Sequence, residues 1–258
     1  MTPRIHGLRS RGTRRLEITV AVAGRVLIQL RRDHRTLAML LVLPCLLITL
    51  LWWMYDAASP ATFDRIGPAL LAIFPVIVMF LVTSVTTLRE RSSGTLERLL
   101  AMPMGKLDFL VGYALAFGLV AAVQSVLAVA VSVGLLGLQV LGPIWLLTLV
   151  AVVDAVLGSA LGLFVSAFAQ TEFQAVQFMP AVVIPQLLLC GLLIPRALLP
   201  DFLERVSDLL PLSYAVDAMQ HLTTSAATGQ VWQDVAIVAA FAIAGLALGA
   251  ATLRRRTA

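Results

Sequence analysis

Six runs of apolar residues, each about as long as a membrane is thick, constrain this chain more than any other feature. A helix needs about 20 mainly apolar residues to cross a hydrocarbon core roughly 30 Å thick. The 258 residues are 60% hydrophobic and 13% charged, whereas a soluble domain has about 45–50% and about 25%. We therefore predict an all-α membrane protein rather than a soluble helical bundle. The six predicted transmembrane helices are 37–55, 66–88, 109–136, 143–169, 175–194 and 232–253.

The basic residues predict how these helices are oriented. Loops on the cytoplasmic side of a membrane carry an excess of Lys and Arg. With six spans, sixteen of the nineteen basic residues fall on the side of the two termini, so we predict cytoplasmic N- and C-termini. The tryptophans agree, because this topology places all four at the outer interface, which tryptophan prefers. They are Trp52, Trp53, Trp145 and Trp232.

The segment before the first span is predicted to lie along the membrane surface. Apolar residues recur at helical spacing within 14–32, but Arg25 interrupts them and the apolar stretch is too short to span. Arginines around that stretch suit an amphipathic interfacial helix beside anionic headgroups, with a simple stop-transfer flank as the alternative. Residues before Arg14 are expected to be irregular. The whole chain, 1–258, is predicted to be one domain, with the tail and interfacial helix in 1–36 and the bundle in 37–258.

A charged island, residues 89–104 (RERSSGTLERLLAMPM), separates the second and third spans. Serine and threonine near its start are helix-capping residues, and Pro103 ends the predicted helix. Three leucines at i, i+3 and i+4 give this helix one apolar face. They are Leu96, Leu99 and Leu100. A helix this short is marginal alone, so it is either a connector at the membrane surface or an element that docks on a partner.

Two segments together resemble a known family. Residues 90–97 (ERSSGTLE), followed by Leu99, Leu100 and Pro103, are similar to the loop after the second span of ATP-binding-cassette (ABC) type-2 exporter permeases of the daunorubicin-resistance kind. Leu199-Pro200 and residues 210–219 (LPLSYAVDAM) resemble that family's segment before the last span. Gln220 stands where the family often has a basic residue, so no charge-dependent role is carried over to it.

The resemblance implies that the island is a cytoplasmic coupling helix, which docks on a separate ABC nucleotide-binding (ATPase) subunit. The implied docking residues are Glu90, Arg91, Gly94, Thr95, Leu96, Glu97, Leu99 and Leu100. ATP and Mg are expected on that subunit, because this chain has no GxxxxGK[ST] phosphate loop and is expected to bind no cofactor and to be no enzyme itself. The other expected partners are a second permease copy or a paralogue and membrane lipids, but no nucleic acid.

The region between the fifth and sixth spans is predicted to form short helices on the outer side, at 201–210 and 212–222, separated by prolines. Pieces this apolar are expected to dip back into the bundle, where protein covers irregular backbone. The resemblance implies re-entrant helices at the exit of a transport path, with a cap that has no transport role as the alternative. The residues singled out there are Pro200, Pro211, Tyr214 and Asp217.

Asp154 lies near the middle of the fourth span, where a charge costs at least about 2.5–3.5 kcal/mol. We interpret it as a transport-path residue, a proton site or a structural hydrogen-bonding group. Gln186 in the fifth span is a milder case of the same kind. No metal site is predicted, because His221 has only Asp217 near it at ligand spacing.

These observations predict the permease subunit of an ATP-driven exporter in a bacterial plasma membrane. Apolar residues of the first, second and fifth spans would line its path, which suits a lipid or an amphipathic drug. The alternative is an ion-coupled secondary transporter or channel that uses Asp154. An intramembrane enzyme is disfavoured, because no Ser-His-Asp or paired-carboxylate arrangement stands out at membrane depth.

Overall fold

The computed structural model describes residues 5–56, 60–92 and 106–252. Within these ranges every regular element is a helix, and six helices are long and apolar enough to cross a membrane. The predicted fold class, an all-α protein with six transmembrane helices, is therefore confirmed.

The spanning helices reproduce the predicted runs with shifted ends. They are α2 (His34–Asp56), α3 (Pro60–Ser92), α5 (Lys106–Val129), α6 (Ile144–Val165), α7 (Glu172–Leu189) and α10 (Gly229–Thr252). The predicted third span is divided, because α5 continues as a π-helix, η1 (Ala130–Leu135). Gly137 follows with a φ of 73°, a left-handed conformation that glycine adopts without strain.

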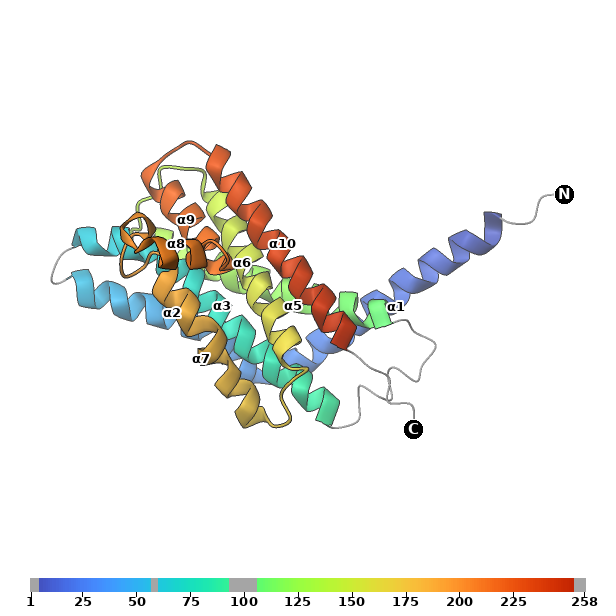
Figure 1. Cartoon of the computed structure of the whole chain (residues 1–258). Coiled ribbons are helices and arrows are strands. Elements are labelled where there is room, and N and C mark those ends of the chain that lie inside the picture. The colour runs from blue at the N-terminus through green and yellow to red at the C-terminus, as the bar shows by residue number, and fades with distance from the viewer. Residues whose placement is uncertain (1–4, 57–59, 93–105, 253–258) are drawn as a thin grey trace.

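α3 and α6 form the centre of the bundle (Figure 1). A Cβ atom on Gly158 of α6 would lie 2.6 Å from the carbonyl oxygen of Val76 in α3, and one on Gly162 would collide with that of Phe80. Small residues four positions apart let two helix backbones approach this closely in a membrane. The most apolar window of α3 is accordingly 67% buried, against 17% in both α2 and α7.

The helices reverse direction at each span, so their ends collect at two ends of the bundle, which we call the α1 end and the α9 end (Figure 1). Trp145 and Trp232 begin α6 and α10, and their ring centroids lie 6.1 Å apart at the α9 end. Trp52 and Trp53 lie near the end of α2, which reaches the same end. All four tryptophans therefore lie at one end of the bundle, as the prediction requires, and that this end faces outward stays a prediction.

α1 (Ile5–Arg32) begins earlier than predicted. Residues before Arg14 were expected to be irregular, and this was wrong for the described part, because the helix starts at Ile5. Gly7 and Gly12 each cost about 1 kcal/mol relative to alanine but do not stop a helix. The N-terminal half of α1 projects away from the bundle (Figure 1).

The C-terminal half of α1 packs on α5 through an apolar face. Val22, Val26 and Leu30 are buried there. Gly112 of α5 provides the space, because a Cβ atom at that position would lie 2.7 Å from a methyl group of Val22. α1 is therefore fixed to the bundle along one face, as an amphipathic helix would be.

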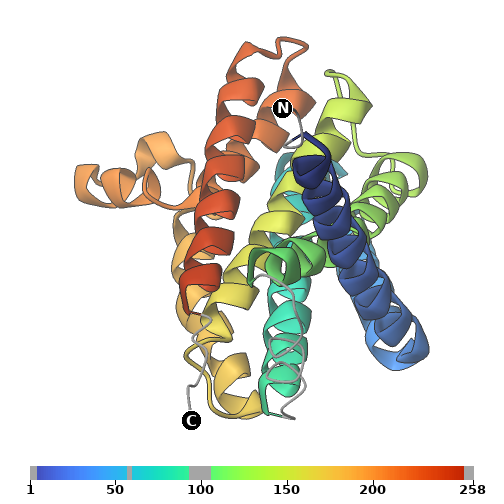
Figure 2. The ribbon, with the colours of Figure 1, turned by 90° about the vertical axis from the view of Figure 1, so that its right-hand side faces the viewer.

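Three short helices connect α7 to α10: η2 (Arg196–Leu198), α8 (Asp201–Ser207) and α9 (Pro211–Thr224). α9 does pack into the bundle, as predicted, and its Leu212, Val216 and Met219 are buried. α8 does not, because its Phe202 is 74% exposed and Leu209, just after it, is 71% exposed. Figure 2 shows α8 standing out from the side of the bundle. The C-terminal end of α8 is instead fixed by polar contacts, because Arg196 donates to Ser207 Oγ and pairs with Asp208.

Candidate functional site

Three consecutive residues at the end of α3 join three different parts of the chain. Successive side chains on a helix point about 100° apart, so neighbours in sequence reach different elements. Arg89 pairs with Glu172 at the start of α7, and Arg91 donates a hydrogen bond of 2.9 Å to the carbonyl of Ser166, between α6 and α7. Glu90 pairs with Arg25 of α1 at 3.5 Å. The end of α3 is thus linked directly to α1, to the α6–α7 turn and to α7.

The ion pair between Arg89 and Glu172 is bidentate. Nε lies 2.7 Å from Oε1, and Nη2 lies 2.9 Å from Oε2. This fork geometry fixes the relative orientation of the two side chains. Both are about half exposed, at 57% and 51%, so the pair adds less than about 1 kcal/mol to stability. Its effect is to align α3 with α7 rather than to hold the fold together.

Glu90 and Arg91, two of the predicted docking residues, face this chain itself. Glu90 is almost completely buried against α1, and Arg91 is partly buried against the α6–α7 turn. The other predicted docking residues lie outside the described residues, so the role of the island stays a prediction. They are Gly94, Thr95, Leu96, Glu97, Leu99 and Leu100.

Sequence reasoning did not find Arg89, Glu172 or Arg25 as partners. Arg89 and Glu172 are 83 positions apart, and no local periodicity relates them. One signal was available, because charged residues are scarce in this chain and Glu172 lies three positions before the start of a predicted span.

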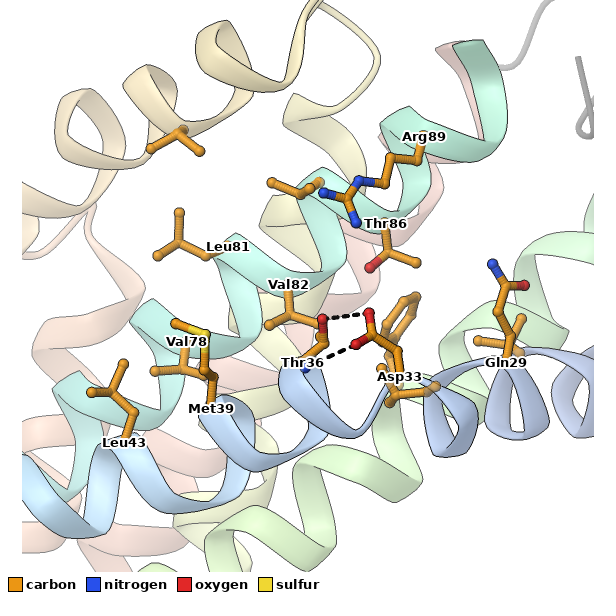
Figure 3. Close-up of a pocket in the computed structure, with 15 residues that line it drawn as sticks. Gln29, Asp33, Thr36, Met39, Leu43, Val78, Leu81, Val82, Thr86 and Arg89 are labelled. Atoms are coloured by element: carbon orange, nitrogen blue, oxygen red, sulfur yellow. Dashed lines mark hydrogen bonds between the residues drawn. The ribbon is translucent and has the colours of Figure 1, made fainter. Parts of the chain in front are cut away.

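A pocket of about 330 Å³ lies at the same end, between α1, α2 and α3. Its walls include Gln29, Asp33, Thr36, Met39, Leu43, Val78, Leu81, Val82, Thr86 and Arg89 (Figure 3). Asp33 caps α2, since its carboxylate accepts hydrogen bonds from the backbone N–H and the hydroxyl of Thr36, at 3.1 and 2.7 Å. These hydrogen bonds hold the pKa of Asp33 below its usual value.

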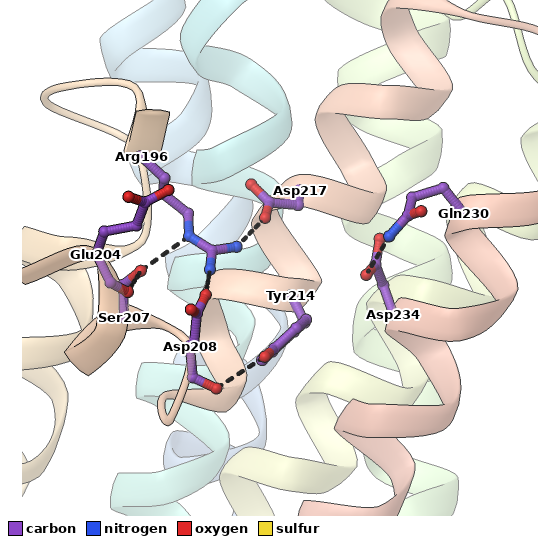
Figure 4. A network of polar contacts seen from close by, with 8 residues as sticks. All are labelled: Arg196, Glu204, Ser207, Asp208, Tyr214, Asp217, Gln230 and Asp234. Atoms are coloured by element: carbon purple, nitrogen blue, oxygen red, sulfur yellow. Dashed lines mark hydrogen bonds and ion pairs between the residues drawn. The ribbon is translucent and has the colours of Figure 1, made fainter. Parts of the chain in front are cut away.

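The α9 end carries a second polar network, centred on Arg196 (Figure 4). Arg196 pairs with Asp208 and Asp217, donates to Ser207 Oγ at 3.0 Å and lies 5.5 Å from the ring centre of Tyr214. The Tyr214 hydroxyl donates to the carbonyl of Asp208 at 2.7 Å. Burial raises the pKa of Asp217, and Arg196 opposes that rise. Tyr214 and Asp217, both singled out in the sequence, therefore belong to one local network.

The remaining predicted residues have structural positions. Pro200 precedes α8, and Pro211 begins α9 as its first residue. Gln186 of α7 donates to the carbonyl of Val182 at 3.0 Å and accepts from the backbone N–H of Leu212 at 3.4 Å. Gln186 thus caps the start of α9 and joins it to α7.

Asp154 is completely buried in α6. Neither of its carboxylate oxygens has a hydrogen-bond partner within the described residues, so the structural hydrogen bond considered for it is not found there. It lines neither the pocket of Figure 3 nor a polar pocket at the α9 end between α9 and α10. Over the described ranges, no cluster of three His, Cys, Asp or Glu side chains could hold a metal ion.

Several known proteins are similar in sequence to much of this chain. Residues 18–223 match the family described as ABC-2 type transporter. The chain is 25% identical over 169 residues to the probable multidrug ABC transporter permease YbhR of Escherichia coli (strain K12), covering 65% of this chain and 46% of that protein. It is 28% identical over 165 residues to the inner membrane transport permease YhhJ of the same organism, covering 63% and 43%.

A eukaryotic protein is similar over the same length. ABC transporter G family member 20 of Dictyostelium discoideum is 26% identical over 168 residues, which is 65% of this chain and 23% of that protein. The chain therefore matches less than half the length of each of these three relatives.

Proposed function

This chain belongs to the ABC-2 type transporter family and is a multi-pass membrane protein, and from that membership we propose that it is the permease subunit of an ATP-driven exporter. ATP and Mg²⁺ would be bound by a separate nucleotide-binding subunit. The working unit would pair this chain with a second copy or a paralogue. The distribution of arginines favours cytoplasmic termini in a bacterial plasma membrane.

One observation carries this proposal: the first residues of the island, at the end of α3, tie that helix to three other segments. Residues 93–105, which hold most of the island, follow Arg91 with only Ser92 between them. A subunit that docks on the island and moves would therefore displace α3. The side-chain links would pass that displacement to α1 and α7. This arrangement suits a permease that receives mechanical work from outside its own chain.

The exposed faces of α2 and α7 support a path between two copies. α7 has the lowest mean hydropathy of the six candidate spans, 1.2, and exposes Gln177 together with Phe173 and Ile184. A mixed face of this kind suits a protein partner or a partly wet path better than lipid alone. The apolar face of α2 suits a hydrophobic or amphipathic substrate, such as a lipid or drug, taken from the cytoplasm or the inner leaflet.

Co-purification tests the docking step. An affinity-tagged chain is expected to retain a nucleotide-binding subunit, and the double substitution Leu96→Asp with Leu99→Asp is expected to release it by charging the apolar face of the island. Leu96→Met with Leu99→Met is the matched control, because it keeps that face apolar. If the Asp double variant retains the subunit in wild-type amount, the docking proposal is wrong.

A second candidate function rests on Asp154. A buried carboxylate without a hydrogen-bond partner within the described residues could be a proton or ion site, as in an ion-coupled transporter. That function predicts transport that follows an ion gradient, needs no ATPase and is abolished by Asp154→Asn. The exporter proposal predicts that Asp154→Asn leaves ATP-dependent transport in place, measured in proteoliposomes with each energy source supplied separately.

A further inference from the structure

The pocket at the α1 end separates polar from apolar side chains along its length. Figure 3 shows Gln29, Asp33 and Arg89 gathered toward one end and Met39 and Leu43 toward the other. The polar end lies where α1 gives way to α2, and the apolar end runs between α2 and α3. Its volume of about 330 Å³ is at the lower end of the range for small-molecule sites, roughly 300–1,000 Å³. The shape suits one polar head with the first part of an apolar tail.

The charges at the polar end favour a cation. Two guanidinium nitrogens of Arg89, Nε and Nη2, donate hydrogen bonds to the two carboxylate oxygens of Glu172. Asp33 is exposed and remains ionised at neutral pH, because Thr36 stabilises its carboxylate. No ion pair within the described residues involves Asp33. Arg32, His34 and Arg35 are near Asp33 in sequence but do not line the pocket. Arg89 also attracts Asp33 electrostatically and helps to lower its pKa. Because Arg89 is hydrogen-bonded to both carboxylate oxygens of Glu172, one cation is shared by two carboxylates, and these three groups together carry one negative charge.

The apolar end opens onto the exposed faces of α2 and α7. Met39 of α2 is 62% exposed and Val176 of α7 is 43% exposed, and both line the pocket. A chain lying between Leu43 and Leu81 could continue past these two residues onto the outer surface of the bundle. A ligand can therefore enter along these faces, from lipid or from the path between two copies, with its tail still surrounded by apolar groups.

We propose that this pocket binds an amphiphile with an ammonium head, which places its ammonium group beside Asp33 and its alkyl chain along Met39, Leu43 and Leu81. Two sources share this chemistry: an ethanolamine phospholipid and a single-chain lipophilic amine. That such a molecule is also the exported cargo rests on the proposed exporter function. The binding itself does not, because it needs only this chain.

Binding is tested with the purified full chain in dodecyl maltoside micelles, because a phosphatidylcholine bilayer would itself supply ammonium heads to the pocket. The probes are dodecylamine and dodecanol, which share one alkyl chain and differ in the charge of the head. Dodecylamine is expected to bind roughly fivefold more tightly, the scale of a partly exposed ion pair. Equal affinity of the two probes would overturn the assignment of Asp33 as the cation partner.

Asp33→Asn is the informative variant, because asparagine caps a helix as well as aspartate does and so preserves the start of α2. It is expected to remove the preference for dodecylamine and leave the affinity for dodecanol unchanged. Asp64→Asn is the matched control, since Asp64 also accepts a backbone hydrogen bond, from Gln139, but lies at the α9 end. If Asp33→Asn and Asp64→Asn give the same dodecylamine affinity, the proposed site is wrong.

A substitution that fills the pocket with a larger side chain tests where the alkyl tail binds. Val82→Trp places a large ring among the pocket walls and is expected to weaken both probes at least fivefold, with an unchanged elution volume in size-exclusion chromatography as evidence of folding. Full dodecylamine binding by a folded Val82→Trp variant would overturn the proposed position of the tail.

Competition identifies the source of the ligand. Displacement of dodecylamine by dioleoylphosphatidylethanolamine but not by dioleoylphosphatidylglycerol would assign the site to a lipid, and displacement by neither would assign it to single-chain amines. Displacement by dioleoylphosphatidylglycerol alone would overturn the proposed preference for an ammonium head. Because no ATPase subunit is present in these measurements, their failure would leave the coupling experiment on Leu96 and Leu99 unaffected.

Discussion

The α3–α6 pair and the attachment of α7 use opposite kinds of contact. α3 and α6 meet backbone to backbone at Gly158 and Gly162, where even one added carbon would collide. α7 is held at one end by the Arg89–Glu172 ion pair and at the other by Gln186, which accepts from Leu212. The most apolar window of α7 is only 17% buried, against 67% in α3.

The difference indicates which part of the bundle can move. Close backbone packing has no second arrangement of similar energy, because every shift either opens a gap or produces a collision. An exposed ion pair costs less than about 1 kcal/mol to break and can re-form elsewhere. Segments with few buried contacts open at low free energy. We therefore expect α7 to move against a rigid α3–α6 centre.

The largest effect is expected at the centre. Gly162→Ala should lower the free energy of unfolding by about 3 kcal/mol, because the new methyl group meets the carbonyl oxygen of Phe80. Gly118→Ala in α5 is the matched control, since the nearest atom there would be 3.9 Å away. That control should be neutral or stabilising by up to about 1 kcal/mol. Thermal unfolding in detergent measures both, and equal losses would refute a rigid centre built on Gly162.

The second prediction concerns the surface through which a second copy of this chain would contact α7. In a background with Cys45→Ala and Cys190→Ala, single cysteines on the exposed face of α7 should form disulfides between two chains under mild oxidation. The positions are Val176, Ile184 and Leu188, with Leu115, Leu119 and Val123 of α5 as equally exposed controls. Bridges require Cα atoms within about 7 Å, so cross-links confined to α5 would place the partner on the wrong helix in our proposal.

A smaller effect is expected where α7 meets α9. Gln186→Leu removes the acceptor for the N–H of Leu212 at the start of α9, which should cost about 1 kcal/mol. Gln177→Leu changes the same residue type at an exposed position of α7 and should leave stability unchanged. Thermal unfolding compares the two, and equal values would show that Gln186 does not attach α7 to α9.

The smallest effect on stability is expected at the α1 end, where the same substitutions should also slow transport. Arg89→Glu or Glu172→Arg alone should cost less than about 1 kcal/mol, because both side chains are half exposed. Each should slow ATP-driven transport in proteoliposomes, and the double swap should restore it by reversing the pair. Full transport by both single variants would show that this pair does not couple α3 to α7.

Much of the fold could be predicted because membrane spans are recorded locally in the sequence. Apolar length identified all six spans, and the tryptophans were correctly placed at one end. The start of α1 was missed, because glycine and arginine suggested an irregular tail although neither residue stops a helix. The exposed position of α8 was missed as well, because its apolar residues suggested burial and the Arg196 network is not visible in the sequence.

The sequence by itself determined that this chain crosses a membrane six times, since each span depends only on its own run of apolar residues. Only the tertiary structure decided that Arg89, Glu90 and Arg91 reach three different segments and that Asp33 lies at the polar end of a pocket. These contacts depend on how each helix is rotated about its axis and on which helices become neighbours. Both are set by packing between residues far apart in sequence, such as Gly162 against Phe80, which no local pattern records.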